Sequence, residues 1–166
     1  MTLPDPTLPS LFTIGYEGAA LQDLIATLQG AGVTLLVDTR ERAQSRRRGF
    51  SKTALGLALK AGGIDYRHLR SLGTPPSIRK DYKMTRDFAV LSLGYRFHLA
   101  TQGEALEELG RWAQSAQVCL LCYEAEPGEC HRSLIAARLQ ELALVGEVVN
   151  LLVSRGYGSG EISAAS

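Results

Sequence analysis

Residues 118–139 bring several side chains that could take part in chemistry close together in the sequence. An apolar run ends at Cys122, and Cys130, His131 and Arg132 stand where a helical pattern begins. At the start of a helix, unpaired backbone N–H groups and the helix dipole stabilise a thiolate. Cys130 is therefore a candidate nucleophile, with His131 as its base or as a charged partner.

Other roles for these residues stay open. Cys130 could be a small packing residue, because free cysteines are among the most buried residue types. Consecutive helical residues point about 100° apart, so His131 need not face Cys130. His68, which follows another predicted strand, is an equal candidate for the partner. Cys122 ends a buried apolar run, where a packing role is favoured.

The spacing excludes one well-known cysteine mechanism. Cysteine phosphatases and arsenate-reductase-like enzymes place an arginine six residues after the nucleophile, but Ala136 stands six residues after Cys130. The chain has no Cys-x-x-Cys pair, which weakens the case for zinc. A zinc site remains an alternative with four candidate ligands, Cys122, Cys130, His131 and His68. We expect no metal and no other cofactor.

The hydrophobic pattern alternates between strands and helices along one continuous series. Strands are predicted over residues 11–15, 33–37, 64–69, 118–123 and 148–153, and helices over residues 21–28, 51–61, 87–99, 104–116 and 130–145. Residues 70–83, with three helix-disfavouring glycine and proline residues, are predicted to be a loop. The pattern predicts an α/β fold: a single three-layer α/β/α domain with a mostly parallel, Rossmann-like sheet. It covers residues 11–153, between an extended lead-in (1–10) and a flexible tail (154–166).

Polar side chains follow the first four predicted strands. Ligands of such sheets bind at the carboxyl ends of the strands, so these side chains should converge on one site. Glu17 could act as a base or nucleophile, and Glu124 could pair with it as in glycosidases. The expected pocket residues at these strand ends are Tyr16, Glu17, Asp38, Arg40, His68, Arg70, Cys122 and Glu124.

Positive charge is concentrated in one part of the chain. The net charge is only +1, but residues 40–86 carry a local balance of +10, and residues 103–150 carry −5. Arginine binds phosphate and carboxylate through two parallel hydrogen bonds. Asp38 could orient Arg40, and Phe50 could stack on a nucleic-acid base. The predicted anion-binding residues are Arg40, Arg46, Lys52, Arg70 and Arg132.

Composition excludes several classes of protein. A chain of 166 residues can bury one core. No apolar run approaches about 18 residues, and the first residues lack a signal-peptide pattern, so no membrane association is expected. Three cysteines do not indicate a disulfide framework. We therefore expect a cytoplasmic protein with free thiols.

Several of these motifs together resemble the family catalogued as domain of unknown function 488. The resemblance extends over residues 11–153, and Thr39 departs mildly from a family pattern that often reads Val-Asp-Val-Arg. It implies one α/β domain with a shared site at these landmarks, and no particular reaction. The motifs are TIGYEG (13–18), VDTR (37–40), GFSK (49–52), YRHL (66–69), LCYE (121–124) and CHRS (130–133).

Two functional hypotheses follow. The first is a small hydrolase or transferase with an anion pocket for a phosphate, nucleotide or nucleic acid, in which Cys130 could be the reactive group. The alternative is a non-catalytic nucleic-acid-binding module that uses the basic loop 40–52. The expected partners are thus a phosphorylated small molecule or a nucleic acid.

Overall fold

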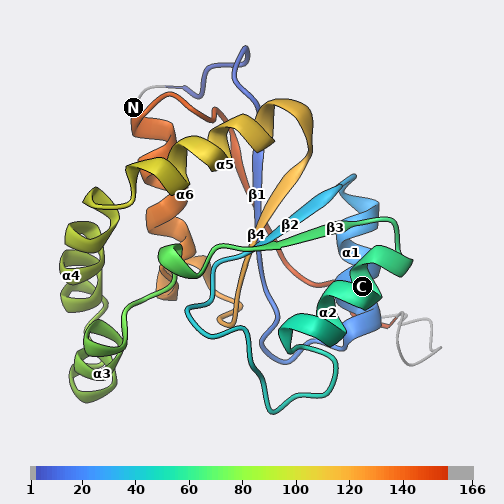
Figure 1. Ribbon diagram of the computed structural model, residues 1–166, viewed down its shortest axis with the longest axis horizontal. Coiled ribbons are helices and arrows are strands. Elements are labelled where there is room, and N and C mark those ends of the chain that lie inside the picture. The colour runs from blue at the N-terminus through green and yellow to red at the C-terminus, as the bar shows by residue number, and fades with distance from the viewer. Residues whose placement is uncertain (1–2, 157–166) are drawn as a thin grey trace.

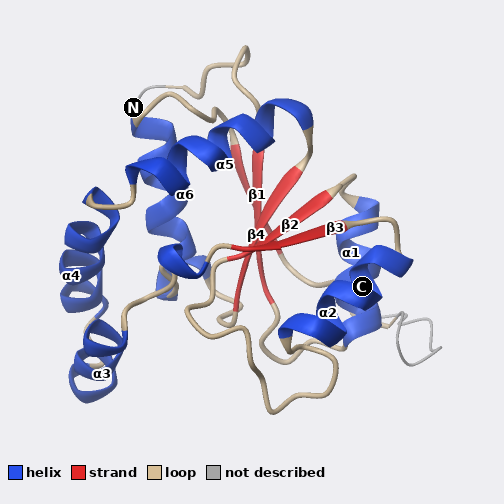
Figure 2. Ribbon diagram, viewed as in Figure 1, coloured by secondary structure: helices blue, strands red, loops and turns tan. Residues whose placement is uncertain are grey.

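The computed structural model describes residues 3–156, which form one α/β domain with a five-stranded, wholly parallel sheet (Figures 1 and 2). The strand order is β3-β2-β4-β1-β5, which confirms the predicted Rossmann-like α/β fold. The predicted tail lies mostly outside the described residues. The strands are β1 (Leu11–Gly15), β2 (Leu35–Asp38), β3 (Asp65–His68), β4 (Val118–Cys122) and β5 (Val148–Leu151).

The sequence of each strand matches its place in the sheet. The central strand β4 reads VCLLC and is buried throughout, as expected for a strand covered on both faces. The edge strands β3 and β5 are only partly buried. The register aligns the strand ends, since Gly15 pairs with Cys122 and Asp38 pairs with both Leu121 and His68. The predicted convergence of these ends is thus present.

Helices cover both faces of the sheet (Figure 2). On one face, leucines of α1 and α2 pack with Ile14 and Leu121. On the other face, α4, α5 and α6 pack around Tyr95 and Leu120. None of the helices in residues 3–156 has the length and apolar character needed to span a membrane. The helices are α1 (Leu21–Gly30), α2 (Lys52–Ala61), α3 (Pro76–Thr85), α4 (Phe88–Ala100), α5 (Gly103–Ser115) and α6 (Arg132–Glu141).

The prediction of a loop over residues 70–83 is wrong. A 3₁₀ turn (Arg70–Leu72) is followed by α3, which packs against α4. Pro76 is the first residue of α3, a position where the missing N–H has no intrahelical partner to lose and the fixed φ suits a helix. The last helix, α6, is also shorter than predicted at both ends: it begins at Arg132, after a 3₁₀ turn (Pro127–Glu129), and ends at Glu141.

Gly15 lies where β1 approaches the loop after β4. A Cβ there would overlap the backbone carbonyl of Glu124 and lie 2.9 Å from Nη1 of Arg132. We expect Gly15→Ala to lower the free energy of unfolding by about 3 kcal/mol, the upper range for overpacking, because backbone must move. Urea titration measures this. Gly128→Ala is the control, since a Cβ there meets no atom within 4 Å, and equal stability of the two variants would contradict the argument.

Candidate functional site

A pocket of about 470 Å³ opens at the carboxyl ends of the strands. Its walls come from the ends of β1 and β4, the loop after β2, and α3. Several of the predicted site residues line it: Tyr16, Glu17, Arg40, Cys122, Glu124, Cys130 and His131. Four widely separated chain segments therefore build a single site.

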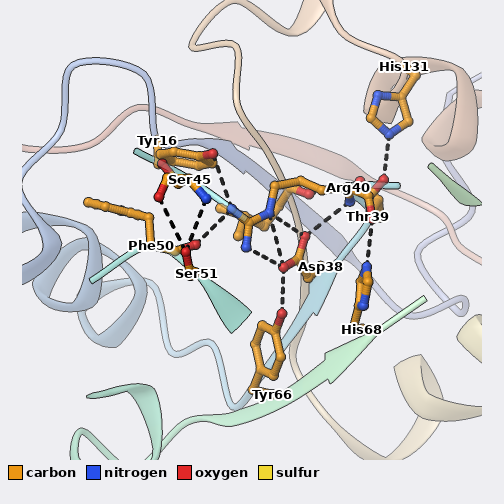
Figure 3. Close-up of polar contacts among 11 residues, drawn as sticks. Tyr16, Asp38, Thr39, Arg40, Ser45, Phe50, Ser51, Tyr66, His68 and His131 are labelled. Atoms are coloured by element: carbon orange, nitrogen blue, oxygen red, sulfur yellow. Dashed lines mark hydrogen bonds and ion pairs between the residues drawn. The ribbon is translucent and has the colours of Figure 1, made fainter. Parts of the chain in front are cut away.

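Asp38 and Arg40 form a buried ion pair at one side of this pocket (Figure 3). The Arg40 guanidinium donates to Asp38 at 2.7 Å through Nη2 and at 2.9 Å through Nε. Its Nη1 donates to the Tyr16 hydroxyl at 3.1 Å and to the Phe50 carbonyl at 2.7 Å. The Tyr66 hydroxyl donates to Asp38 at 2.5 Å. Arg40 is thus held rigidly by protein partners, which leaves it little capacity for a ligand.

The ion pair changes the proton affinity of its neighbours. Burial lowers the pKa of Arg40, but the hydrogen bonds and charge of Asp38 outweigh burial and raise it overall. Burial raises the pKa of Tyr66, and the negative charge of Asp38 raises it further. The Tyr66 phenol therefore stays protonated and remains a donor to Asp38.

His131 is a buried, neutral imidazole. Its Nε2 lies 2.8 Å from the carbonyl oxygen of Thr39, which can only accept, so Nε2 carries the proton (Figure 3). Nδ1 is then an unprotonated acceptor, 3.6 Å from Sγ of Cys130. Burial lowers the pKa of His131 to about 4, although the bond to Thr39 opposes this shift. His131 therefore faces Cys130 as a base and not as an imidazolium.

Cys122 and Cys130 form a disulfide in this structure. The expectation of free thiols is wrong for these two residues, because the turn after β4 brings Cys130 back over the strand end. Cys119 is free and buried in the core beside α1 and α2, and burial raises the pKa of its thiol. This environment gives Cys119 a packing role.

Arg132 points into the protein and not into the pocket. It is fully buried, and burial lowers its pKa. Its guanidinium donates to Thr13 Oγ1 at 3.2 Å, to Cys122 Sγ at 2.7 Å and to the carbonyl oxygens of Glu124 and Ala125. These bonds fasten the loop after β4 to the sheet.

The remaining predicted anion-binding residues lie around the pocket without lining it. Arg46 is exposed in the loop after β2. Lys52 lines a separate shallow hollow beside β3, together with Arg67. Arg70 is exposed and forms an ion pair with Glu41 at 3.0 Å.

Basic side chains that the sequence did not single out as ligands line the pocket instead. Arg42 follows β2, Arg79 and Lys83 come from α3, and Arg86 is the residue that follows α3. Their spacing of four and then three residues was a signal for one helix face, but the prolines before them suggested a loop.

Glu41 lies among three arginines at the pocket wall. Its carboxylate is 3.0 Å from Arg70, 3.6 Å from Arg79 and 3.7 Å from Arg42. Its side chain is only 10% exposed, and its Oε2 has no hydrogen-bond partner among the described residues. This carboxylate balances part of the positive charge of the pocket.

The two carboxylates predicted at the strand ends both line the pocket. Glu17 accepts a hydrogen bond from the backbone N–H of Ala125 at 3.1 Å. Burial raises the pKa of Glu124. His68 lies elsewhere, with Nε2 2.6 Å from the carbonyl oxygen of Arg40. It is therefore not the partner of Cys130 in this structure.

One group of potential metal ligands occurs in residues 3–156. Donor atoms of Cys122, Glu124 and Cys130 all lie within 4.8 Å of one another. Thiolates and not disulfide sulfurs bind zinc, so the group offers only its carboxylate in this state. His68 lies outside the group, so the four predicted zinc ligands are not assembled.

A comparison with models of protein families found a match that spans most of the elements around the pocket. The model of the family described as "Domain of unknown function DUF488" matches residues 20–139, which include the basic loop, α3 and the disulfide. Neither the curated proteins nor the solved structures include one that the chain matches. The match extends over most of the chain, and the protein therefore belongs to the DUF488 family.

Proposed function

We propose that the protein is a small hydrolase or transferase that binds a phosphorylated or otherwise anionic ligand in the pocket at the strand ends. One observation carries this proposal. Basic side chains from two separate segments line the same pocket as Cys130 and His131: Arg42 after β2, and Arg79, Lys83 and Arg86 in or directly after α3. The pocket thus combines basic side chains with a cysteine and a neighbouring histidine.

Four glutamates also line the pocket, Glu17, Glu41, Glu124 and Glu129, and two of them oppose anion binding less than a free carboxylate would. Glu41 is neutralised by the arginines around it. Glu124 has a raised pKa, which suits it to donate a proton to a leaving group. In the reduced protein, Cys130 would pass its proton to Nδ1 of His131 and attack the ligand held by the arginines.

The observations favour a small ligand over the nucleic-acid-binding alternative. Phe50, the expected stacking residue, is buried against the Tyr16 ring, with the ring centres 4.7 Å apart. Arg47 donates to the carbonyl oxygens of Tyr16 and Ala19. Several groups that would serve a nucleic acid are therefore engaged within the protein.

Adenosine monophosphate provides a direct test, with neutral adenosine as its uncharged counterpart. We expect calorimetry to detect binding of the phosphate ester and a loss of affinity of at least about tenfold in Arg79→Gln/Arg86→Gln, because two cations are removed. Arg111→Gln removes an exposed arginine of α5 and should bind like the wild type. Pyrophosphate extends the test to ligands without a base. Absence of binding to both phosphorylated probes, or equal affinity in the double variant, would refute the proposal.

A further inference from the structure

The disulfide lies at the wall of the pocket, and it links two residues that are only eight positions apart in the sequence. Cys122 is the last residue of β4, and Cys130 follows the next turn. Both side chains are nearly inaccessible as parts of the core, yet both contribute to the pocket lining. The pocket is therefore the side from which a small molecule would approach the two sulfurs.

Each sulfur has a different neighbour that would activate its reduced form. Nη1 of Arg132 lies 2.7 Å from Sγ of Cys122, and a fixed positive charge at that distance favours a thiolate. Arg132 is held in place by Thr13 and by two backbone carbonyls, so it cannot turn away. Cys122 is therefore the sulfur that would carry the negative charge.

Cys130 is paired with a base instead. Nδ1 of His131 is 3.6 Å from its sulfur, and the bond from Nε2 to Thr39 keeps the free electron pair on Nδ1. The imidazole is neutral near pH 7, so Nδ1 has a free electron pair for the thiol proton, while burial makes the ring a weaker base than a free imidazole. One thiolate and one thiol beside a base are the groups that thiol–disulfide exchange requires.

We propose that Cys122 and Cys130 are a redox-active pair that exchanges between disulfide and dithiol with a low-molecular-weight disulfide as co-reactant. The Cys122 thiolate attacks one sulfur of R–S–S–R, which forms a mixed disulfide and releases RS⁻. Cys130 passes its proton to His131 and attacks Sγ of Cys122. The second RS⁻ leaves and takes the proton as RSH. The pair loses two electrons, and R–S–S–R gains them.

This inference goes beyond anion binding and has a consequence for it. While the disulfide is formed, Cys130 has no thiolate and cannot act as a nucleophile, so the proposed transfer reaction would not proceed. Excess thiol reverses the exchange and restores the nucleophile. The oxidation state of the pocket would thus decide whether its cysteine chemistry is available.

The test counts thiols at equilibrium. Wild-type protein is equilibrated in glutathione buffers of increasing disulfide fraction, quenched in acid, unfolded and treated with N-ethylmaleimide before its intact mass is measured. We expect the modified thiols to fall from three to one, with Cys119 as the one that remains. Cys119→Ser is the control, and it should also lose two thiols.

A variant of Cys130 shows whether Cys122 is the cysteine that attacks first. Cys130→Ser should accumulate a mixed disulfide of glutathione at Cys122, because the resolving thiol is missing. The proposal is overturned if all three thiols react in every buffer, or if peptide mapping places Cys119 in the bond. Binding of adenosine monophosphate to the same wild-type samples separates the two proposals. If the thiol count stays constant and binding is retained, only the redox proposal is refuted. If the thiol count falls as expected but adenosine monophosphate does not bind, only the anion site is refuted.

Discussion

Replacing Asp38 with asparagine should lower the free energy of unfolding by about 3–5 kcal/mol, the range for breaking a buried ion pair on one side. Asp38 is fully buried and accepts hydrogen bonds from the side chains of Arg40 and Tyr66. Asparagine has a similar shape but no charge, so the guanidinium of Arg40 stays buried without a counter-ion. Denaturant titration at neutral pH measures the loss.

Two further variants show whether the charge is the cause. Asp65→Asn, at an exposed position of β3, should stay within about 0.5 kcal/mol of the wild type. Asp38→Asn/Arg40→Met removes both charges and should recover part of the loss. A cost below about 1 kcal/mol for Asp38→Asn would show that water or another residue compensates Arg40.

His131 should make the stability depend on pH. The folded protein keeps the imidazole neutral down to a pKa of about 4, whereas the unfolded chain binds the proton near the ordinary value of 6.5. The unfolded state thus holds more protons between these values, and stability falls as the pH falls through this window. From about pH 7 to about pH 4.5, we expect a loss of about 2–3 kcal/mol from this group.

The contribution of His131 is isolated by comparison with His131→Gln, which has no titrating ring. The stability difference between wild type and variant should shrink by this amount as the pH is lowered. Parallel curves for the wild type and His131→Gln would contradict the assignment of a buried neutral imidazole.

The sequence predicts the sheet better than it predicts the site. Apolar runs such as VCLLC and the glycines that end α1 and α2 are local signals, so five strands and most helices could be placed. The start of α3 was missed because Pro75 and Pro76 favour both a loop and a first helical turn, and only packing against α4 decides between them.

The roles of the arginines could not be read from the chain. Residue type makes Arg40, Arg46 and Arg132 candidate anion ligands, but it does not say where each guanidinium points. Arg132 donates to carbonyls formed by a turn seven and eight residues away, and Arg40 is held by Asp38. Such partners depend on how the loops close over the strand ends, which is a property of the assembled fold.

The carboxylate of Glu41 has a consequence for which anions can enter. It already forms ion pairs with two arginines that line the pocket, Arg42 and Arg79, and because it is attached to the chain it competes with a ligand at an effective concentration of ~1 mM or above. A ligand with a single carboxylate offers the arginines no more charge than Glu41 does. In the proposed anion site, a dianionic phosphate would offer more charge and more acceptor oxygens, so we expect the Glu41 carboxylate to select against ligands with a single negative charge.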